Sequence, residues 1–346
     1  MPLLNVLIGL PGSGKSYYGS KLLKKYKKKY KHRDTVIISS DQIRKELYGS
    51  EEVQGKASDV FKLMFDRTKE YLCNNINVIY DATNINMKKR YNLVHQLRDA
   101  VNSYIYCTCT VIAAPYDYCL YRNSNRERTV PEDVIKRMYY NFEFPLEKEG
   151  WNEISVIAPD ELNKLCKKYS RDLMKFIEST AKTYPAHDNP YHKTDITTHM
   201  KLTANYAMKL DGSGFGKSKD SIARYFAALY HDIGKYKTRT EKDGITHYYN
   251  HANVGAYDMM CFLTKRIKRC ETYYKIFLLI VTLINYHMKP FDWEKKCKNN
   301  NYITADIRKY FIDIHLDLLI LHTCDTKCEE ELTEKSKKKI YFLNKI

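Results

Sequence analysis

The glycine-rich stretch near the start of the chain has the spacing of a phosphate-binding loop. It lies between an apolar run and a segment of helical character, and it matches the pattern G-x-x-x-x-G-K-[ST] in the strand, loop and helix context that this pattern requires. The lysine can reach the β- and γ-phosphates, the serine hydroxyl can hold Mg²⁺, and the helix adds its positive amino-terminal end. We therefore expect ATP with Mg²⁺ to bind through the residues Gly9, Pro11, Gly12, Ser13, Gly14, Lys15 and Ser16.

Charged residues that suit phosphoryl transfer follow the next two apolar runs. Asp41 follows the second predicted strand and precedes Arg44 by three residues, and Asp81 and Asn84 follow the third. A carboxylate at Asp41 can accept the proton of a hydroxyl that attacks the γ-phosphate, and Arg44 can hold a phosphate of the acceptor. Asp81 has the position of a Walker B acid. Each motif alone is also typical of a helix cap or a strand-end turn.

A third charged segment runs from Arg122 to Pro131 and has the composition of a lid. Arg122, Arg126 and Arg128 fall within seven residues, just before a helix that a proline would start. Arginines in such a segment can close over a triphosphate and neutralise charge in the transition state. Arginine pairs on a helix are more often solvated, so this segment gains meaning only beside the others.

Together these motifs resemble the kinase domain of the phage-type polynucleotide 5′-kinases, over about residues 3 to 145. The matching segments are G-L-P-G-S-G-K-S, S-D-Q-I-R, D-A-T-N and R-N-S-N-R-E-R-T-V-P-E-D-V. The resemblance implies Asp41 as the general base and Arg44 on the 3′-phosphate of the acceptor. It also implies three further roles: Lys15 and Ser16 on ATP·Mg²⁺, Arg122 and Arg126 on the donor phosphates, and Asp81 and Asn84 beside Arg44 on the acceptor side.

Histidine and aspartate residues recur in the second half of the chain. The pair His231-Asp232 ends an apolar helical segment and precedes Gly234 and Lys235. The other members of the set are His199, His251, His287 and Asp325, each in a predicted helix or at its edge. Four to six nitrogen and oxygen ligands suit one or two divalent ions such as Mn²⁺, Co²⁺, Ni²⁺ or Zn²⁺. Such a centre can activate water to attack phosphorus.

This ordered set is similar to that of the HD phosphohydrolase superfamily, over about residues 185 to 330. The segments H-D-I-G-K, H-Y-Y-N-H-A-N-V-G-A and N-Y-H-M-K-P carry the similarity. The resemblance implies that one metal ion is bound by His199, His231, Asp232 and Asp325. It implies that His251 and His287 bind a second metal ion or the substrate phosphate, and that Asp232 and Lys235 are catalytic. It also implies that Asn189 and His192 lie at the mouth of the site. We interpret the remaining histidines of this half, His187, His247, His315 and His322, as structural. Bacterial RNA-repair fusions of a polynucleotide kinase and an HD domain are similar in content, but there the HD domain comes first.

The hydrophobic pattern predicts two domains of different class. Strand-like and helix-like runs alternate through residues 1–160, which indicates an α/β P-loop domain with a parallel sheet covered on both faces. No convincing strand follows Pro159. We expect a helical linker at 161–184, with a helix over Glu161–Thr180, and then an all-α HD domain at 185–346.

Composition restricts the cellular setting. The chain has 346 residues, and its ten cysteines form no C-x-x-C pair, which favours reduced thiols and a cytoplasmic protein. The kinase resemblance also admits a phage-encoded protein in a bacterial host. The longest apolar run is too short to cross a bilayer, so we expect no membrane partner. A net charge of +17 indicates a polyanionic partner, and the basic run Lys24–Arg33 is either a solvated helix face or a nucleic-acid contact.

The sequence therefore predicts a bifunctional nucleic-acid end-healing enzyme. It would phosphorylate 5′-hydroxyl ends with ATP and remove a 2′,3′-cyclic phosphate or 3′-phosphate with a bound metal. RNA ends, including those of cleaved tRNA, are favoured over DNA, and a separate ligase would act next. The first alternative is a small-molecule kinase fused to an HD nucleotide phosphohydrolase. The second is a non-catalytic, nucleotide-gated RNA-binding module.

Overall fold

The computed structural model describes residues 1–50, 55–160, 194–212, 216–264, 270–297 and 303–328. The chain forms two compact units, one of Met1–Tyr139 with Pro145–Lys164 and one of Tyr140–Phe144 with Leu165–Ile346. The predicted linker 161–184 with its helix lies outside the described residues, as do His187, Asn189 and His192. Among the described residues, no helix is both long and apolar enough to span a membrane.

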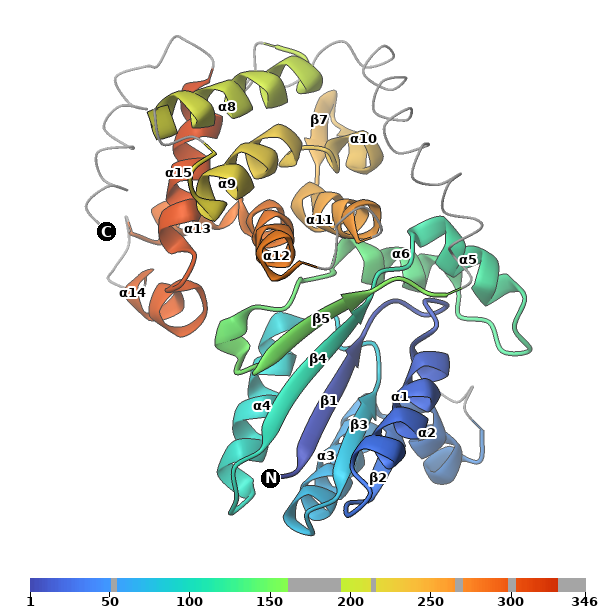
Figure 1. Ribbon diagram of the computed structural model, residues 1–346. Helices are drawn as coiled ribbons and strands as arrows, with labels where there is room; N and C mark the ends of the chain where they lie inside the picture. The colour runs from blue at the N-terminus through green and yellow to red at the C-terminus, as the bar shows by residue number, and fades with distance from the viewer. Residues whose placement is uncertain (51–54, 161–193, 213–215, 265–269, 298–302, 329–346) are drawn as a thin grey trace. The chain divides into compact units, whose positions relative to one another are not determined.

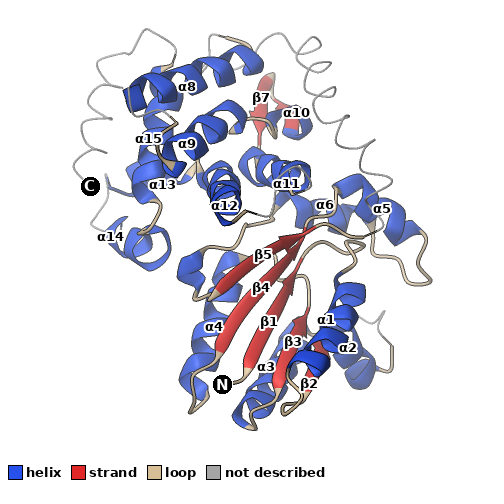
Figure 2. Cartoon of the chain, in the orientation of Figure 1, coloured by secondary structure: helices blue, strands red, loops and turns tan. Residues whose placement is uncertain are grey.

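The first unit is built on a five-stranded parallel sheet with the strand order β2-β3-β1-β4-β5. The arrows in Figures 1 and 2 show this sheet. Its strands are β1 (Leu3–Ile8), β2 (Thr35–Ser39), β3 (Asn77–Asp81), β4 (Tyr106–Ile112) and β5 (Glu153–Ile157). All residues of β1 and β3 are buried, as expected for strands covered on both faces. The prediction of a parallel α/β sheet is confirmed.

Helices of the first unit cover the sheet. They are α1 (Lys15–Lys29), α2 (Ser40–Tyr48), α3 (Ala57–Cys73), α4 (Met87–Ala100), α5 (Tyr116–Ser124), α6 (Glu132–Tyr140) and the 3₁₀ turn η1 (Glu147–Glu149). The apolar stripe of α1 packs Leu22 against Leu7 of β1 and Ile79 of β3. Helices α3 and α4 lie behind the sheet in the view of Figure 1.

Three chain segments that carry predicted site residues begin at the carboxyl ends of neighbouring strands. Strand β1 ends at Ile8, directly before the glycine-rich loop, β2 ends at Ser39, and β3 ends at Asp81. In an open parallel sheet, ligands bind outside the carboxyl ends of the strands. The fold therefore brings the loop, the start of α2 and the end of β3 to one place.

A buried ion pair supports the segment that follows β3. Arg90 of α4 donates two hydrogen bonds to the carboxylate of Glu149, from Nε and Nη2, at 2.7 and 2.8 Å. Its Nη1 donates a third bond to the carbonyl oxygen of Asn84 at 2.8 Å. Both side chains of the pair are fully buried, and removing one partner of such a pair leaves an uncompensated charge. The pair holds the backbone after Asp81 in position.

The second unit is helical, as predicted. Its described helices are α8 (Ile196–Asp211), α9 (Lys219–Tyr230), α10 (Lys235–Thr238), α11 (His251–Leu263), α12 (Glu271–Tyr286), α13 (Lys289–Cys297), α14 (Ile303–Asp306), the π-helical turn η3 (Ile307–Phe311) and α15 (His315–Lys327). The expectation of no strand after Pro159 is wrong at one place. An antiparallel hairpin joins β6 (Arg239–Lys242) to β7 (Ile245–Tyr248), and its alternation is hard to see because most of its residues are polar.

The short segment Tyr140–Phe144, which precedes η1 in sequence, belongs to the second unit. The side-chain oxygen of Asn285 accepts a hydrogen bond from Phe144 N at 2.5 Å, and the Tyr286 hydroxyl donates to Phe144 O at 2.6 Å. The Phe142 ring packs edge-on against Tyr257 at 4.9 Å. The chain thus enters the second unit briefly before it forms β5.

Candidate active site and metal centre

The glycine-rich loop is shaped by close backbone contacts. Gly12 has a φ of 81°, and a Cβ at this position would lie 2.2 Å from the carbonyl oxygen of Cys119 in α5. No other residue fits there without moving that helix. The Lys15 ammonium group bonds to the carbonyl of Leu10 at 2.8 Å, and Gly9 N bonds to Thr83 O at 3.0 Å. The loop is therefore tied to the segment that follows β3.

Asp81 lies beside the end of this loop. Its side chain is buried, and burial raises the pKa of its carboxyl group, while Lys15 and Ser16 oppose this shift. Burial also lowers the pKa of Lys15, with Asp81 opposing. A P-loop serine next to a strand-end aspartate is the arrangement that holds Mg²⁺ in P-loop enzymes. Asp81 thus lies with the residues predicted to bind ATP, whereas a contact of Asp81 with the acceptor stays a prediction.

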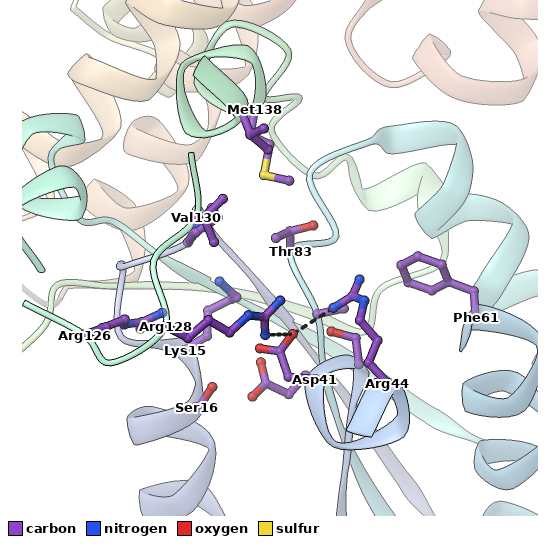
Figure 3. Close-up of a pocket in the computed structure, with 15 residues that line it drawn as sticks. Lys15, Ser16, Asp41, Arg44, Phe61, Thr83, Arg126, Arg128, Val130 and Met138 are labelled. Atoms are coloured by element: carbon purple, nitrogen blue, oxygen red, sulfur yellow. Dashed lines mark hydrogen bonds and ion pairs between the residues drawn. The ribbon is translucent and has the colours of Figure 1, made fainter. Parts of the chain in front are cut away.

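Asp41 is held between two arginines at the start of α2. Its Oδ1 atom is 2.8 Å from Nη1 of Arg44 and 3.1 Å from Nη1 of Arg128. Figure 3 shows the carboxylate between the two guanidinium groups. Half of the Asp41 side chain remains exposed, so a substrate can reach it.

These groups face one pocket with a volume of about 160 Å³. Its lining combines the loop, the start of α2, one residue of α3, the end of β3 and the segment around α6: Pro11, Lys15, Ser16, Ser40, Asp41, Arg44, Phe61, Asp81, Ala82, Thr83, Arg126, Arg128, Val130, Val134 and Met138. Figure 3 shows Lys15 and Ser16 on one side of Asp41 and Arg44 on the other. The residues predicted for the phosphate donor and for the acceptor therefore share a single pocket.

Several predicted residues of this domain are not in the lining of the pocket: Gly9, Gly12, Ser13, Gly14, Asn84 and Arg122. Arg122 reaches the Tyr118 hydroxyl at 3.5 Å, and its Nη1 lies 3.6 Å from where a Cβ on Gly14 would be. The Asn84 amide donates to the carbonyl of Leu7 at 2.7 Å. Asn84 thus fastens the strand-end backbone, and its predicted contact with the acceptor stays a prediction.

In the second unit, six predicted ligands converge from the ends and faces of helices. His231 follows α9 and His287 follows α12, while His251 is the first residue of α11. His199 lies in α8 and Asp325 in α15. Asp232 completes the set, and five of the six residues are buried.

The ligand atoms form two groups that meet at Asp232. His199, His231 and Asp325 make one group, and Asp232, His251 and His287 make the other. Asp232 faces both groups, because its Oδ2 lies 3.3 Å from His231 Nε2 while its Oδ1 lies 3.3 Å from His251 Nε2. Such an aspartate can bridge two metal ions.

The imidazole rings are oriented by backbone carbonyl groups. The Nδ1 atoms of His231, His251 and His287 each lie 2.8 Å from a carbonyl oxygen three residues earlier in the chain. Donation from Nδ1 fixes the tautomer and leaves the Nε2 lone pair for a metal. The Nε2 atoms of His251 and His287 face each other at 3.1 Å. Two nitrogens about 2.1 Å from one octahedral ion would lie about 3 Å apart, so these residues fit a divalent metal.

The charges in this centre shift its titration. Burial alone would lower the pKa of His231, but Asp232 and Asp325 raise it to about 9. Burial, with His251 and His231, lowers the pKa of His287 to about 3. His287 is therefore neutral at pH 7, the form that binds a metal, whereas His231 must lose a proton before it can do so.

A close helix contact positions the His-Asp pair. A Cβ at Gly234 would lie 2.0 Å from the carbonyl oxygen of His251, so a side chain at Gly234 would push α11 away. The next residue, Lys235, is buried and places Nζ 2.6 Å from Asp232 Oδ2. The motif therefore supplies a ligand pair, a tight contact and a buried ammonium group.

Comparison with protein-family models assigns both units. Residues 4–145 match the model of an AAA domain, and residues 196–326 match that of an HD domain. This chain joins a P-loop AAA domain to an HD domain. AAA domains of this kinase-like type imply ATP and Mg²⁺, and HD domains bind divalent metals, so the chain has the parts of an enzyme with two separate centres.

Two curated relatives each match about half of this chain. The L-seryl-tRNA(Sec) kinase of Methanococcus maripaludis is 30% identical over 177 residues, which are 51% of this chain and 65% of that protein. Protein kti12 of Schizosaccharomyces pombe is 28% identical over 162 residues, 44% of this chain and 55% of the relative. The chain therefore spans less than two thirds of the length of either protein.

Solved structures give more distant likenesses. A chain of the Pnkp1/Rnl/Hen1 RNA repair complex is 20% identical, with 40% of this chain and 43% of that chain covered and a TM-score of 0.33. A gluconokinase from Sinorhizobium meliloti 1021 is 14% identical, with 45% and 82% covered and a TM-score of 0.31.

Sequence reasoning gave several pocket residues of the AAA domain no individual contact. Arg128 is the main one, because it contacts Asp41 directly. Its place in the arginine-rich segment was a signal, but spacing alone did not say which arginine turns toward the aspartate. Phe61 and Thr83 also line the pocket, and neither belongs to a motif that names it.

Proposed function

We propose that the chain heals nucleic-acid ends, preferably those of RNA, by two reactions in two domains. The AAA domain would transfer the γ-phosphate of ATP to a 5′-hydroxyl. The HD domain would remove a 2′,3′-cyclic phosphate or a 3′-phosphate. Both reactions would prepare an RNA end for a separate ligase, and the proposed substrates include cleaved tRNA.

The kinase proposal rests on one observation, the shared pocket of Lys15, Ser16, Asp41 and Arg44. In the proposed reaction Asp41 accepts the proton of the 5′-hydroxyl, and the oxygen of that hydroxyl forms a bond to the γ-phosphorus. The bond from that phosphorus to the β–γ bridging oxygen breaks, and ADP leaves. Arg44 would hold the 3′-phosphate of the acceptor, and Arg126 would neutralise charge on the donor phosphates.

The hydrolase proposal rests on the converging ligands of the HD domain. A divalent ion held by His199, His231, Asp232 and Asp325 would polarise the phosphate and activate a water molecule. His251 and His287 would hold a second ion or the phosphate itself. The buried Lys235 ammonium group would neutralise a phosphate oxygen as one ester bond to the ribose breaks.

A second acceptor is favoured by one relative. The archaeal protein that is 30% identical is named for phosphorylating the serine carried by a tRNA. That acceptor is also a hydroxyl attached to RNA, so the same base and phosphate-binding residues would serve it. A small-molecule kinase joined to an HD nucleotidase remains a third candidate, and a net charge of +17 argues for the polyanionic acceptors over it.

The end-healing proposal is tested by mapping both termini of one RNA, and a seryl-tRNA in a parallel reaction tests the second acceptor. The purified protein is incubated with ATP, Mg²⁺, Mn²⁺ and an RNA that carries a 5′-hydroxyl and a 2′,3′-cyclic phosphate, and both ends are then mapped. We expect a 5′-phosphate at one end. At the other end we expect either a 2′,3′-diol or the monophosphate that forms when the cyclic phosphate is opened. A seryl-tRNA that becomes phosphorylated while the 5′-hydroxyl RNA does not would replace the end-healing proposal with the second acceptor.

A further inference from the structure

A second pocket in the AAA domain lies on one face of the sheet, on the side of α1. It has a volume of about 390 Å³ and lies beside α1 and the amino ends of β1, β3, β4 and β5. Its lining combines basic, aromatic and polar groups: Met1, Leu3, Asn5, Tyr18, Leu22, Lys25, Tyr26, Lys29, Tyr30, Arg33, Asn77, Tyr106, Thr108, Thr110, Glu153 and Ser155. Pockets of this size accommodate a small organic ligand.

The floor of the second pocket is polar, which is unusual for a parallel sheet. Asn5 of β1 is paired with Thr108 of β4, and Thr108 with Glu153 of β5. The next row on this face contains Thr110 and Ser155. The Asn5 amide bonds to both threonine hydroxyls, at 2.7 and 3.2 Å. Hydrogen-bonding groups therefore replace the apolar residues that would pack under a covering helix.

One wall of the second pocket is a stripe of α1. Tyr18, Leu22 and Tyr26 are spaced four residues apart, and Lys25 and Lys29 lie beside them on the same side of the helix. The Tyr26 and Tyr30 rings make an edge contact with centroids 5.7 Å apart, and Lys29 Nζ lies 4.9 Å from the centroid of the Tyr30 ring.

The helix divides the basic run Lys24–Arg33 into two sets. Lys25, Lys29 and Arg33 line the second pocket, whereas Lys24, Lys27 and Lys28 do not. Arg33 donates to the carbonyl of Met1, and its buried Nε atom has no hydrogen-bond partner within the described part of the chain. The basic run is therefore not a uniform solvated face.

We propose that this second pocket is a binding subsite for a nucleotide of a single RNA strand whose 5′ end occupies the active site. Lys25, Lys29 and Arg33 would contact phosphates, and the tyrosines would pack against a base, as in other single-strand sites. The exposed Glu153 carboxylate at the floor could accept a bond from a ribose hydroxyl. This inference rests on the proposed function, since it takes the kinase acceptor to be RNA.

Distance along α1 sets the length of RNA that can reach the lysines of this subsite. The pocket begins at Tyr18, one helical turn after Lys15, but Lys25 and Lys29 lie farther along the helix, roughly 15 to 20 Å from Lys15 at about 1.5 Å per residue. A stacked strand at about 3.4 Å per nucleotide needs roughly six nucleotides to cover that distance. A trinucleotide in the active site therefore cannot reach Lys25 and Lys29, whereas a 20-mer can.

The test compares two double substitutions with the same spacing and the same loss of charge on α1. Lys25→Ala with Lys29→Ala removes pocket residues, and Lys24→Ala with Lys28→Ala is the matched control. Fluorescence anisotropy measures binding of a labelled single-stranded 20-mer RNA over a range of salt. We expect the first variant to bind the RNA about tenfold more weakly. The magnitude of its slope of log K against log salt should fall by roughly 1.4, the value for two lost phosphate contacts on a single strand. The affinity of the control should change less than twofold. Equal effects of the two variants, or none, would overturn the subsite.

Phosphorylation of a 5′-hydroxyl trinucleotide by the same proteins tests the proposed function separately. We expect all three proteins to phosphorylate it at the same rate, which also shows that the variants are folded. If the unaltered protein fails on the trinucleotide and on the 20-mer, the kinase proposal is wrong, and the anisotropy comparison still decides whether the second pocket binds RNA.

Discussion

In the P-loop pocket the charged side chains form ion pairs with one another and line a partly exposed cavity. In the HD centre the ligand side chains are mostly buried and lie close to one another. Asp41 is half exposed and shares its Oδ1 atom between two arginines. His231 and Asp232 are almost fully buried, and the His231 ring is fixed by a backbone carbonyl. The first arrangement suits a substrate that brings its own metal as ATP·Mg²⁺. The second suits a metal that stays with the protein.

The comparison also shows how each centre depends on its fold. The P-loop pocket is assembled largely from segments at the carboxyl ends of three strands, so the sheet places charged groups around a space that a substrate can enter. Three of the HD ligands lie within α8, α11 and α15, and the other three directly follow α9 or α12. Their geometry therefore depends on helix packing, such as the contact at Gly234. Substitutions should therefore affect the two centres differently.

The largest expected effect is the loss of metal from the HD domain on Asp232→Ala. Asp232 faces both ligand groups, so its removal should abolish bound metal and all phosphohydrolase activity while the 5′-kinase activity persists. Metal content by mass spectrometry and both end reactions would be measured, with His247→Ala as the control outside the centre. A variant that keeps stoichiometric metal would contradict the bridging role.

The next effect is confined to the kinase. Asp41→Ala should lower the rate of phosphate transfer by about 10²–10⁴, the usual contribution of a general base, and leave ATP binding nearly intact. Lys15→Ala is the contrasting variant, because it should lose ATP binding itself. Single-turnover rates and ATP affinity would be measured for both, and full transfer activity in Asp41→Ala would show that another group takes the proton.

Metal binding by the HD domain should depend on pH. Since the pKa of His231 is raised to about 9, the ring is protonated below that pH and must release a proton to bind a metal. Apparent metal affinity should therefore fall about tenfold per pH unit as the pH drops below 9, or about a hundredfold by pH 7. Chelator competition between pH 6 and 9 measures this slope. A flat profile would mean that the metal does not bind through His231.

The smallest effect concerns the acceptor. Arg44→Ala should raise the KM for an acceptor with a 3′-phosphate by roughly tenfold, in line with the loss of one charged hydrogen bond. The KM for an acceptor without that phosphate should stay unchanged. Arg128→Ala is the matched control, because it also contacts Asp41 but has no predicted part in acceptor binding. Equal KM changes for both acceptors would remove Arg44 from the 3′-phosphate.

Much of the AAA fold could be predicted from local pattern. The apolar runs before Gly9, Asp41 and Asp81 became β1, β2 and β3, and their parallel pairing brought these segments to one edge. The sequence could not tell which lysines of the Lys24–Arg33 run face the sheet, because that depends on how α1 packs through Leu22. It also could not assign Arg128 to Asp41, since a lid segment has no fixed periodicity.

Prediction was less complete in the HD domain for a different reason. The ligand types were readable from the order of histidines and aspartates, and the structure brings all six together. The division into two groups around Asp232 depends on the side-chain rotamers of distant helices, which no local pattern specifies. The hairpin β6–β7 was missed because Arg239–Lys242 is charged and largely exposed. The entry of Tyr140–Phe144 into the second unit also lacks any local signal.

The central claim is that two independent centres act on the two ends of one RNA. The direct measurement maps both termini of an RNA with a 5′-hydroxyl and a 2′,3′-cyclic phosphate after incubation with the Lys15→Ala and Asp232→Ala proteins. We expect Lys15→Ala to open the cyclic phosphate but leave the 5′-hydroxyl, and Asp232→Ala to phosphorylate the 5′ end but leave the cyclic phosphate. If either folded variant loses both reactions, the centres are coupled. If the unaltered protein changes neither end, the end-healing account is wrong.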